Sequence, residues 1–298
     1  MHRRIWLQGS LAVGATWLAG CAGVQKNSGL EADDASHPLA QIEARTGGRL
    51  GVAVIDTANG RQWQYRGSER FPLCSTFKLL LAAQVLQRDQ QGLDSLAQRV
   101  TYPRSALVPY SPTTEAQADG AGLTVAELCE AAVVLSDNTA ANLLLARQGG
   151  PAGLTAWLRD MGTMHTRLDR LEPELNNVPP GDERDTTTPL SMARAVVALA
   201  KGPHLDASHQ AQLLQWLKAS PTGAKRLRAG MPQGWLVGGK TGSGDGIAND
   251  VLLAWPHHRA QPLVVSAYLT QTPHLSPAAR DAALAEVGQA VAHWFRRF

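Results

Sequence analysis

The sequence has few cysteines and no excess of charge of either sign, and these shortages exclude several classes of protein. Three cysteines in 298 residues cannot supply a disulfide framework. The net charge is only +3, and no basic stripe is interleaved with aromatic residues, which argues against nucleic-acid binding. None of the nine histidines has the spacing of a metal site, and the adjacent pair His257-His258 is expected to be solvated. The sequence therefore predicts neither a metal nor another cofactor.

Long apolar runs are missing as well, apart from one modest run near the start of the sequence. Ile5 to Ala19 is short and glycine-rich for a membrane span, and no other candidate span follows it. The run comes after Arg3-Arg4 and ends in Leu18-Ala19-Gly20-Cys21. This ending resembles the signal of a bacterial lipoprotein, in which Cys21 would be the lipidated residue.

Each of the signals that residues 1–21 resemble predicts export of the protein. Residues 2–7 also resemble a degenerate twin-arginine motif, and an ordinary secretory signal cleaved near Ala22 is the alternative to a lipoprotein signal. Residues 22–37 are mostly polar and are expected to act as a tether. The expected product is a monomeric periplasmic protein anchored to a bacterial membrane only through its lipid.

The chain as a whole has the composition of a soluble globular protein with a sizeable core, because 44% of its 298 residues are hydrophobic. Branched apolar runs predict a hairpin of strands over 49–66 around the turn Asn59-Gly60. Further strands are predicted at 235–240, 250–255 and 262–270. Helical patterns are found at 38–46, 76–88, 125–148, 151–160, 188–200, 207–217 and 277–295.

Strands at both ends of the chain with helices between them predict one antiparallel sheet built from both ends. The predicted fold class is therefore α/β, more strictly α+β, with two lobes. Residues 38–74 and 218–298 would form the α/β lobe, in which helices flank the sheet. Residues 75–217 would form an inserted all-helical lobe, and the seam between the lobes is the expected cleft.

The clearest chemical signal is Ser75-Thr76-Phe77-Lys78, at the expected start of a helix. Unpaired N–H groups and the helix dipole stabilise negative charge at that position. Residues three apart share one face of a helix, so Lys78 is expected to lie one turn behind the Ser75 hydroxyl. A partly desolvated lysine can accept or relay the proton of a nucleophilic serine.

Three further clusters follow in order, and together with Ser75-x-x-Lys78 they carry a family resemblance. They are Ser136-Asp137-Asn138, the loop that begins at Arg170-Leu171-Glu172-Pro173, and Lys240-Thr241-Gly242 on a predicted strand. From about residue 38 onward the sequence resembles a class A serine β-lactamase, whose motifs are Ser-x-x-Lys, Ser-Asp-Asn and Lys-Thr-Gly. The resemblance implies a two-lobe fold of the serine β-lactamase and D,D-peptidase type.

The resemblance implies that the chain opens the β-lactam ring through an acyl-serine intermediate. Ser75 would be the nucleophile, and the backbone N–H groups of Ser75 and Ser243 would bind the oxyanion. Ser136 resembles the serine that passes a proton to the departing nitrogen. Whether Lys78 or Glu172 accepts the Ser75 proton is disputed for the family.

Substrate contacts are implied in the same way. Asn138 matches the side chain that holds the substrate amide. Arg226 resembles an arginine that supports the substrate carboxylate in some subgroups, and its alternative is a surface salt bridge. Tyr110 resembles an aromatic residue at the mouth of the cleft, and its alternative is packing within a lobe. A cation and two hydroxyls would bind the carboxylate itself, namely Lys240, Thr241 and Ser243.

Glu172 distinguishes turnover from simple acylation. Fast turnover needs a base that activates water against the ester, and Glu172 and Asn176 could hold that water between them. An exposed loop position is the alternative for a glutamate that precedes a proline. The resemblance further implies a cis Glu172–Pro173 bond and an ion pair between Arg170 and Asp185.

Both remaining cysteines depart from family patterns. Cys74 precedes the nucleophile, as in some carbapenem-hydrolysing relatives, but the partner position is occupied by Gly244. Cys129 also lacks the partner found in some penicillinases, because Ala82 stands there. Both are expected to be buried free thiols, and neither extended-spectrum nor carbapenem activity is implied.

The resulting hypothesis is a hydrolase that cleaves penicillins or cephalosporins and confers resistance to them. Two alternatives share part of its machinery. A D,D-peptidase or transpeptidase would have the serine, lysine and Lys-Thr-Gly parts but would lack the Glu172 loop. A β-lactam sensor would stay acylated and would normally work with a membrane-spanning signalling partner.

Overall fold

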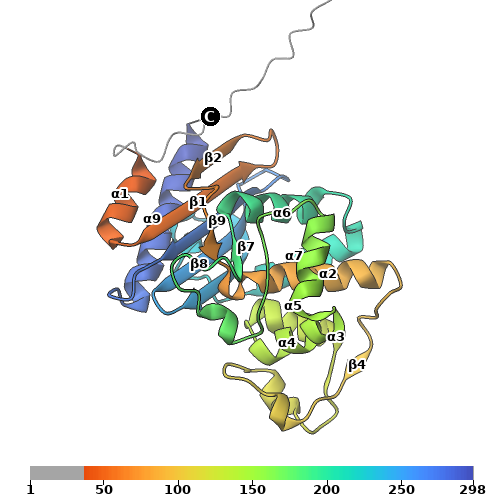
Figure 1. The fold of residues 1–298 in the computed structure, drawn as a ribbon. Coiled ribbons are helices and arrows are strands. Elements are labelled where there is room, and N and C mark those ends of the chain that lie inside the picture. The colour runs from red at the N-terminus through yellow and green to blue at the C-terminus, as the bar shows by residue number, and fades with distance from the viewer. Residues whose placement is uncertain (1–36, 298) are drawn as a thin grey trace, which may run out of the picture.

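Residues 37–297 are described by a computed structural model, and their strands form one main sheet (Figure 1). The predicted export signal, Cys21 and nearly all of the predicted tether lie outside the described residues. Within residues 37–297, no helix is both long enough and apolar enough to cross a membrane.

The sheet is antiparallel, has the strand order β2-β1-β9-β8-β7, and draws its strands from both ends of the chain. The predicted hairpin around Asn59-Gly60 joins its first two strands, and Gly60 has the positive φ of +74° that the turn requires. Its strands are β1 (Arg49–Asp56), β2 (Gln62–Tyr65), β7 (Leu236–Gly244), β8 (Ile247–Trp255) and β9 (Leu263–Thr270).

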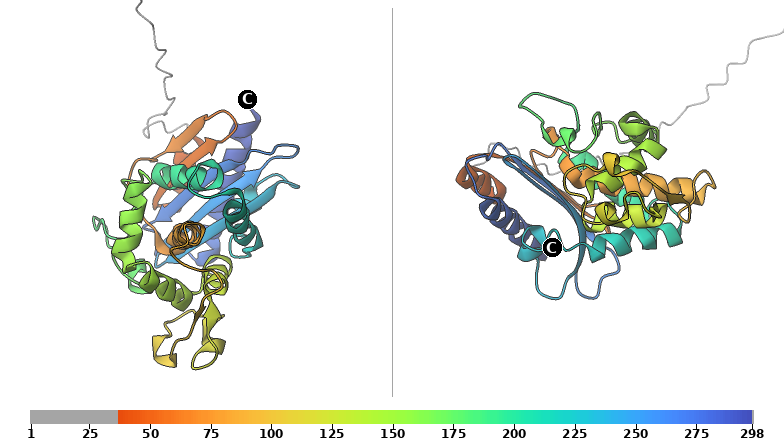
Figure 2. Two further views of the ribbon diagram at one scale, coloured as in Figure 1. Left: turned by 90° about the vertical axis from the view of Figure 1, so that its right-hand side faces the viewer. Right: turned by 90° about the horizontal axis from the view of Figure 1, so that it is seen from below.

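Alternating side chains of the sheet supply two separate cores. In β1, Val52 and Val54 pack into one core and Ala53 and Ile55 into the other, as the two-residue period of a strand dictates. The first core is closed by helices α1 (Pro38–Thr46), α8 (Leu227–Gly230) and α9 (Pro277–Arg296), and Figure 2 shows α1 and α9 on that face. The predicted helices 38–46 and 277–295 are therefore confirmed within one residue.

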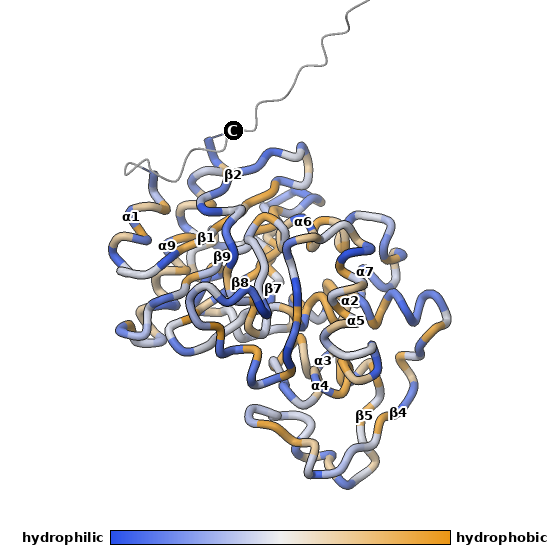
Figure 3. Tube along the Cα trace, in the orientation of Figure 1, coloured by the Kyte–Doolittle hydropathy of each residue, from blue (hydrophilic) through white to orange (hydrophobic). Residues whose placement is uncertain are grey.

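The opposite face of the sheet carries the remaining helices. Helix α2 (Phe77–Gln90) runs through their centre and is buried at every position from Phe77 to Leu86. The apolar segments coloured orange in Figure 3 gather around it. Two other helices on this face also contact the sheet. Helix α6 (Pro189–Lys201) packs against β1 and β9, and α7 (Ala207–Ala219) packs against β7. Helix α5 (Gly150–Asp160) packs against α2 and α4 (Asn138–Arg147).

The segment predicted as helical over 125–148 consists of two helices, α3 (Val125–Val134) and α4 (Asn138–Arg147). They are separated because Ser136 has a φ of +64° and cannot continue a right-handed helix. Asp137 then caps α4 by accepting a hydrogen bond from the Ala140 N–H at 2.8 Å. The turn between the helices thus places Ser136 at an edge of the helical layer.

Two short strand pairs complete the described structure. Strands β3 (Phe71–Pro72) and β6 (Thr186–Thr187) pair antiparallel just before α2, and β4 (Arg99–Val100) pairs with β5 (Leu123–Thr124) at the far end of the helical layer. The first pair ties the entry of α2 to the end of the segment that carries Glu172.

Candidate active site

Ser75 lies in a short 3₁₀ turn, η1 (Cys74–Thr76), that leads directly into α2. The residue before it, Cys74, has a φ of +42°, a strained conformation of the kind that clusters at functional sites. The Asn249 side chain of β8 fixes the entry to this turn, because its amide donates to the carbonyls of Pro72 at 2.8 Å and Leu73 at 3.2 Å. The sheet therefore holds the turn that carries Ser75 in place.

Strand β7 approaches this turn closely because Gly242 has no side chain. A Cβ atom at Gly242 would lie 2.9 Å from the Leu73 carbonyl oxygen and 3.0 Å from the Cys74 Cβ. Both distances are shorter than ordinary contacts, so even a methyl group would push the strand away. The glycine of the Lys-Thr-Gly motif thus allows Ser243 to lie on a strand packed against the turn of Ser75.

Lys78 is completely buried and has three oxygen partners. Its Nζ lies 2.9 Å from Glu172 Oε1, 2.9 Å from the Ser136 carbonyl oxygen and 2.5 Å from Asn138 Oδ1. Burial lowers the pKa of Lys78, and the negative charge of Glu172 opposes that shift. A lysine with a lowered pKa can release and accept protons more readily than a solvated one.

Glu172 is 1% exposed, so the alternative of an exposed loop position is wrong. Its Oε1 accepts a hydrogen bond from the Ser75 hydroxyl at 2.9 Å, and its Oε2 accepts one from Asn176 Nδ2 at 2.5 Å. The bond between Glu172 and Pro173 is cis, as the resemblance implies. The carboxylate thus contacts the Ser75 hydroxyl, the buried Lys78 and the Asn176 amide.

The backbone of the segment with Glu172 is tied down at both ends. Arg170 and Asp185 form the expected ion pair, with 2.6 Å between Nε and Oδ2. Helix α4 supplies a further contact, because the side chain of Asn142 donates to the Glu172 carbonyl at 2.9 Å and accepts from the Glu172 N–H at 3.0 Å. This double hydrogen bond fixes the backbone of Glu172 with respect to the helices.

The turn of Ser136 and Asn138 faces the same cluster. The Ser136 hydroxyl accepts a hydrogen bond from Lys240 Nζ at 2.9 Å, and Asn138 Nδ2 donates to the Pro109 carbonyl at 2.8 Å. Asp137 is fully buried and accepts hydrogen bonds from Thr113 and Thr114, which fastens the turn to the loop before it. The middle residue of the motif is therefore structural.

Lys240 and Arg226 supply positive charge beside this turn. Lys240 is fully buried, and its pKa is lowered by burial and by the nearby charge of Lys78. Arg226 donates to the Ser243 hydroxyl at 2.7 Å and forms an ion pair with Asp281 at 2.7 Å. Its side chain is only 11% exposed, so it does not lie on the open surface. The Thr241 hydroxyl points to Thr222, 2.8 Å away.

Comparison with known proteins explains why these groups meet. Residues 35–295 match the model of the Beta-lactamase enzyme family. The chain is 47% identical to the β-lactamase CTX-M-8 of Citrobacter amalonaticus over 84% of its own length and 86% of that protein's. It is 46% identical to the β-lactamase Toho-1 of Escherichia coli, over 89% and 90% of the two chains. The structure of an ancestral (GNCA) class A β-lactamase superposes with a TM-score of 0.84 at 58% identity, covering 86% of this chain and 98% of the other.

The chain belongs to the class A β-lactamases. The family's two-lobe α+β fold is therefore the fold of this chain, as the sequence predicts. The structure brings ten of the predicted site residues into one connected cluster of hydrogen bonds and ion pairs. They are Ser75, Lys78, Ser136, Asn138, Glu172, Asn176, Lys240, Thr241, Arg226 and Ser243, the last two through the backbone of β7.

Tyr110 lies at the edge of that cluster in this β-lactamase. Its side chain is 62% exposed, and its carbonyl accepts a hydrogen bond from the Asn138 N–H at 2.9 Å. The position would suit contact with a bound substrate, which stays a prediction.

Both Cys74 and Cys129 are buried free thiols, as expected. Among residues 37–297, no group of His, Cys, Asp or Glu side chains could hold a metal ion.

Sequence reasoning did not identify several supporting residues of this β-lactamase. Asn142 holds Glu172, Thr222 meets Thr241, and Asp281 pairs with Arg226. Asp250 is buried behind Thr241, its partner across the β7–β8 ladder. Each lies outside the short motifs, so the spacing of residues gives no signal for it. A polar residue within an apolar strand, as in Asn249-Asp250, was the one available hint.

Proposed function

We propose that this class A β-lactamase hydrolyses penicillins and cephalosporins through an acyl-serine intermediate in which Glu172 is the base for turnover. Hydrolysis of the β-lactam amide is the activity of the family, and it confers resistance. The observation that carries the finer proposal is the pair of contacts at Glu172, whose two oxygens face Ser75 and Asn176.

In acylation, the Ser75 oxygen attacks the β-lactam carbonyl carbon as its proton leaves. Glu172 is the favoured acceptor, because its Oε1 accepts the Ser75 hydroxyl at 2.9 Å while the Nζ of Lys78 lies on the same oxygen. The N–H groups of Ser75 and Ser243 would bind the developing oxyanion. The carbon–nitrogen bond then breaks, and Ser136, which accepts a hydrogen bond from Lys240, would deliver a proton to the nitrogen. The proton that Glu172 accepted would return to Ser136 through Lys78, whose Nζ lies 2.9 Å from Glu172 Oε1 and 2.9 Å from the Ser136 carbonyl, so that Glu172 is again a carboxylate.

In deacylation, Glu172 would take a proton from a water molecule, and the resulting hydroxide would attack the ester carbonyl. The ester bond breaks, and Ser75 takes its proton back from Glu172, whose Oε1 lies 2.9 Å from the Ser75 hydroxyl oxygen. Asn176 supports this role because its amide orients Glu172 Oε2. Its own Oδ1 is buried and has no hydrogen-bond partner among the described residues, so it can accept from that water.

The substrate carboxylate would bind where positive charge and hydroxyls converge. Lys240, Thr241 and Ser243 lie along β7, and Arg226 donates to the Ser243 hydroxyl. Tyr110 and Asn138 would contact the rest of the substrate from the opposite side. These roles follow the resemblance and the shared location of the side chains.

Glu172→Gln tests the proposal. The amide keeps the size of the side chain but cannot accept a proton from water, so acyl-enzyme should accumulate and turnover should fall by about 10²-fold or more. Intact-protein mass spectrometry after benzylpenicillin addition would detect the adduct, and nitrocefin hydrolysis would give the rate. Ser75→Ala is the matched control and should form no adduct. Turnover of the Glu172 variant at the parent rate would contradict the proposal.

We further propose that the protein is exported, lipidated at Cys21 and located in the periplasm as a monomer. The support is the sequence of residues 1–21, with its arginine pair, apolar run and lipobox-like ending. The division into an α/β lobe (38–74 and 218–298) and a helical lobe (75–217) also stays a proposal. It is supported by the position of the Glu172 cluster between the sheet and the helices.

A further inference from the structure

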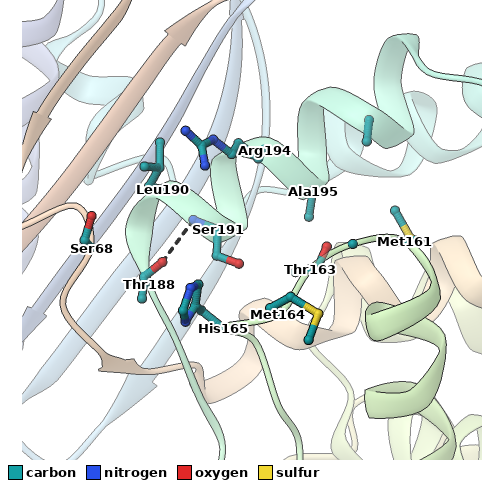
Figure 4. Close-up of a pocket in the computed structure, with 12 residues that line it drawn as sticks. Ser68, Met161, Thr163, Met164, His165, Thr188, Leu190, Ser191, Arg194 and Ala195 are labelled. Atoms are coloured by element: carbon teal, nitrogen blue, oxygen red, sulfur yellow. Dashed lines mark hydrogen bonds between the residues drawn. The ribbon is translucent and has the colours of Figure 1, made fainter. Parts of the chain in front are cut away.

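A second cleft, separate from the Glu172 cluster, lies where the chain leaves α5 and where α6 begins (Figure 4). Its walls are residues 161–165, the start of α6 and Ser68, and its volume is about 550 Å³. Sites for small molecules commonly have volumes of about 300–1,000 Å³. The cleft is thus large enough for a small ligand.

Two polar groups of this cleft are donors without hydrogen-bond partners among the described residues, whereas its Thr188 and Ser191 hydroxyls already have partners. Arg194 on α6 is exposed and forms no hydrogen bond or ion pair with any residue in 37–297. The Thr163 hydroxyl is directed across the cleft toward α6 and likewise has no hydrogen-bond partner in that range, although the residue is only 6% exposed. The cleft is also lined by the imidazole ring of His165 and the hydroxyl of Ser68. No acidic side chain is found among the described residues that line the cleft.

Of the arginines behind the lining, Arg159 is the one without a carboxylate partner among residues 37–297. It donates to the Thr166 carbonyl at 2.7 Å and also to the carbonyl of Thr163, which supports the lining loop. Arg167 is paired with Asp169, and Arg70 lies 3.6 Å from Glu183. The positive charge that would attract an anion into the cleft is therefore that of Arg194 and Arg159.

Apolar side chains lie beside the polar ones on both walls of the cleft, on residues 161–165 and on α6 (Figure 4). Met161, Leu190 and Ala195 line the cleft, together with Met164, whose side chain is 58% exposed. Methionine side chains adapt to ligands of different shapes because they are unbranched and polarisable. A ligand with an apolar body would cover Met164 and would gain free energy from that burial.

We propose that this cleft is a binding site for a small organic anion, with its carboxylate or sulfonate at Arg194 and Thr163 and its apolar body against Met161 and Met164. The cleft adjoins the start of the segment that carries Glu172, because the Ser191 hydroxyl, which lines it, is 3.3 Å from that of Thr166. A ligand that binds only the folded protein stabilises it, so a bound anion should also raise the melting temperature.

Fluorescence titration with anilinonaphthalene sulfonate tests the proposal on the complete folded protein. Arg194→Gln should weaken binding by about tenfold or more, as expected for the loss of a hydrogen bond to a charged group. Phenylnaphthylamine, which lacks the sulfonate, should bind weakly and should not respond to this substitution. Arg104→Gln, an exposed arginine at the far end of the helical layer, is the matched control and should bind the sulfonate like the parent.

A second variant tests how much the apolar side chains contribute to binding. Met164→Ala should weaken binding of both probes, and the exposure of this residue makes a folding defect unexpected. Octanoate and hydrolysed benzylpenicillin should displace the sulfonate probe, and the tighter of the two identifies the favoured source of the anion. Unchanged binding in both variants, or equal loss of the charged and neutral probes in Arg194→Gln, would overturn the proposal.

Discussion

Single buried residues differ in how well their charge is compensated. Asp185 accepts hydrogen bonds from the Asp169 and Arg170 N–H groups and pairs with the Arg170 side chain, so its two oxygens are satisfied. Asp250 is buried to a similar degree but has only a 3.2 Å hydrogen bond from the Leu227 N–H, and its Oδ1 has no partner among the described residues. Burial raises the pKa of Asp250 to about 7, against the opposing charge of Arg226.

Asp250→Asn should therefore change how stability depends on pH. Between the ordinary pKa of 3.8 and about 7, the folded parent holds a proton that the unfolded chain releases, so parent stability falls as pH rises through this range. An amide at this position does not titrate. The variant should gain roughly 2–3 kcal/mol relative to the parent between pH 5 and pH 8.

Urea unfolding at pH 5 and pH 8 would measure this difference between variant and parent. Asp160→Asn, at an exposed position on α5, is the control and should follow the parent at both pH values. A pH-independent difference between Asp250→Asn and the parent would show that the carboxyl does not titrate in this range.

Residues of the site could be predicted from the sequence where they belong to compact motifs. Ser75, Lys78 and Glu172 were identified because each lies in a short run with a recognisable order. Their supporting partners could not be identified in this way, since Asn142 is 30 positions from Glu172 and reaches it only through the packing of α4. Contacts of that kind depend on tertiary structure, which local spacing does not contain.

Among the elements, α4 carries the side chain that holds the backbone of Glu172, the base in the proposed mechanism. Asn142→Ala removes both hydrogen bonds to the Glu172 backbone. Because a small displacement of Glu172 would lower the rate of the step in which it activates water, deacylation should slow by about 10–10²-fold while acylation changes little. Pre-steady-state nitrocefin hydrolysis should then show a burst, and kcat and KM should fall together. Asn142 is a positioning residue, so loss of stability with unchanged kcat would contradict this role.

The boundaries of elements were predictable where the local chemistry marks them. Pro38 and Pro277 begin α1 and α9, and both helices start where proline favours a first turn. The break between α3 and α4 was not predicted from the helical pattern over 125–148. A serine with positive φ breaks the helix there, and serine by itself does not signal that conformation.

At the scale of the whole molecule, the proposed anchor would attach the domain to a membrane at Cys21. Labelling of producing cells with palmitate should mark the parent protein, and Cys21→Ser should abolish the label because the thiol is the acylated group. Nitrocefin hydrolysis by the purified variant should match that of the parent, since the described fold begins at residue 37. An unlabelled parent protein would exclude lipidation.

The order of strands in the sheet has a consequence for synthesis. One neighbour of β1 is its own hairpin partner, but the other is β9, and Arg49 pairs with Thr270 near the opposite end of the chain. A ribosome must therefore release almost the entire polypeptide before the middle of the sheet can close, and contacts this distant in sequence form slowly. Until then, the apolar surface of β1 would be open to chaperones, to translocation machinery and to aggregation.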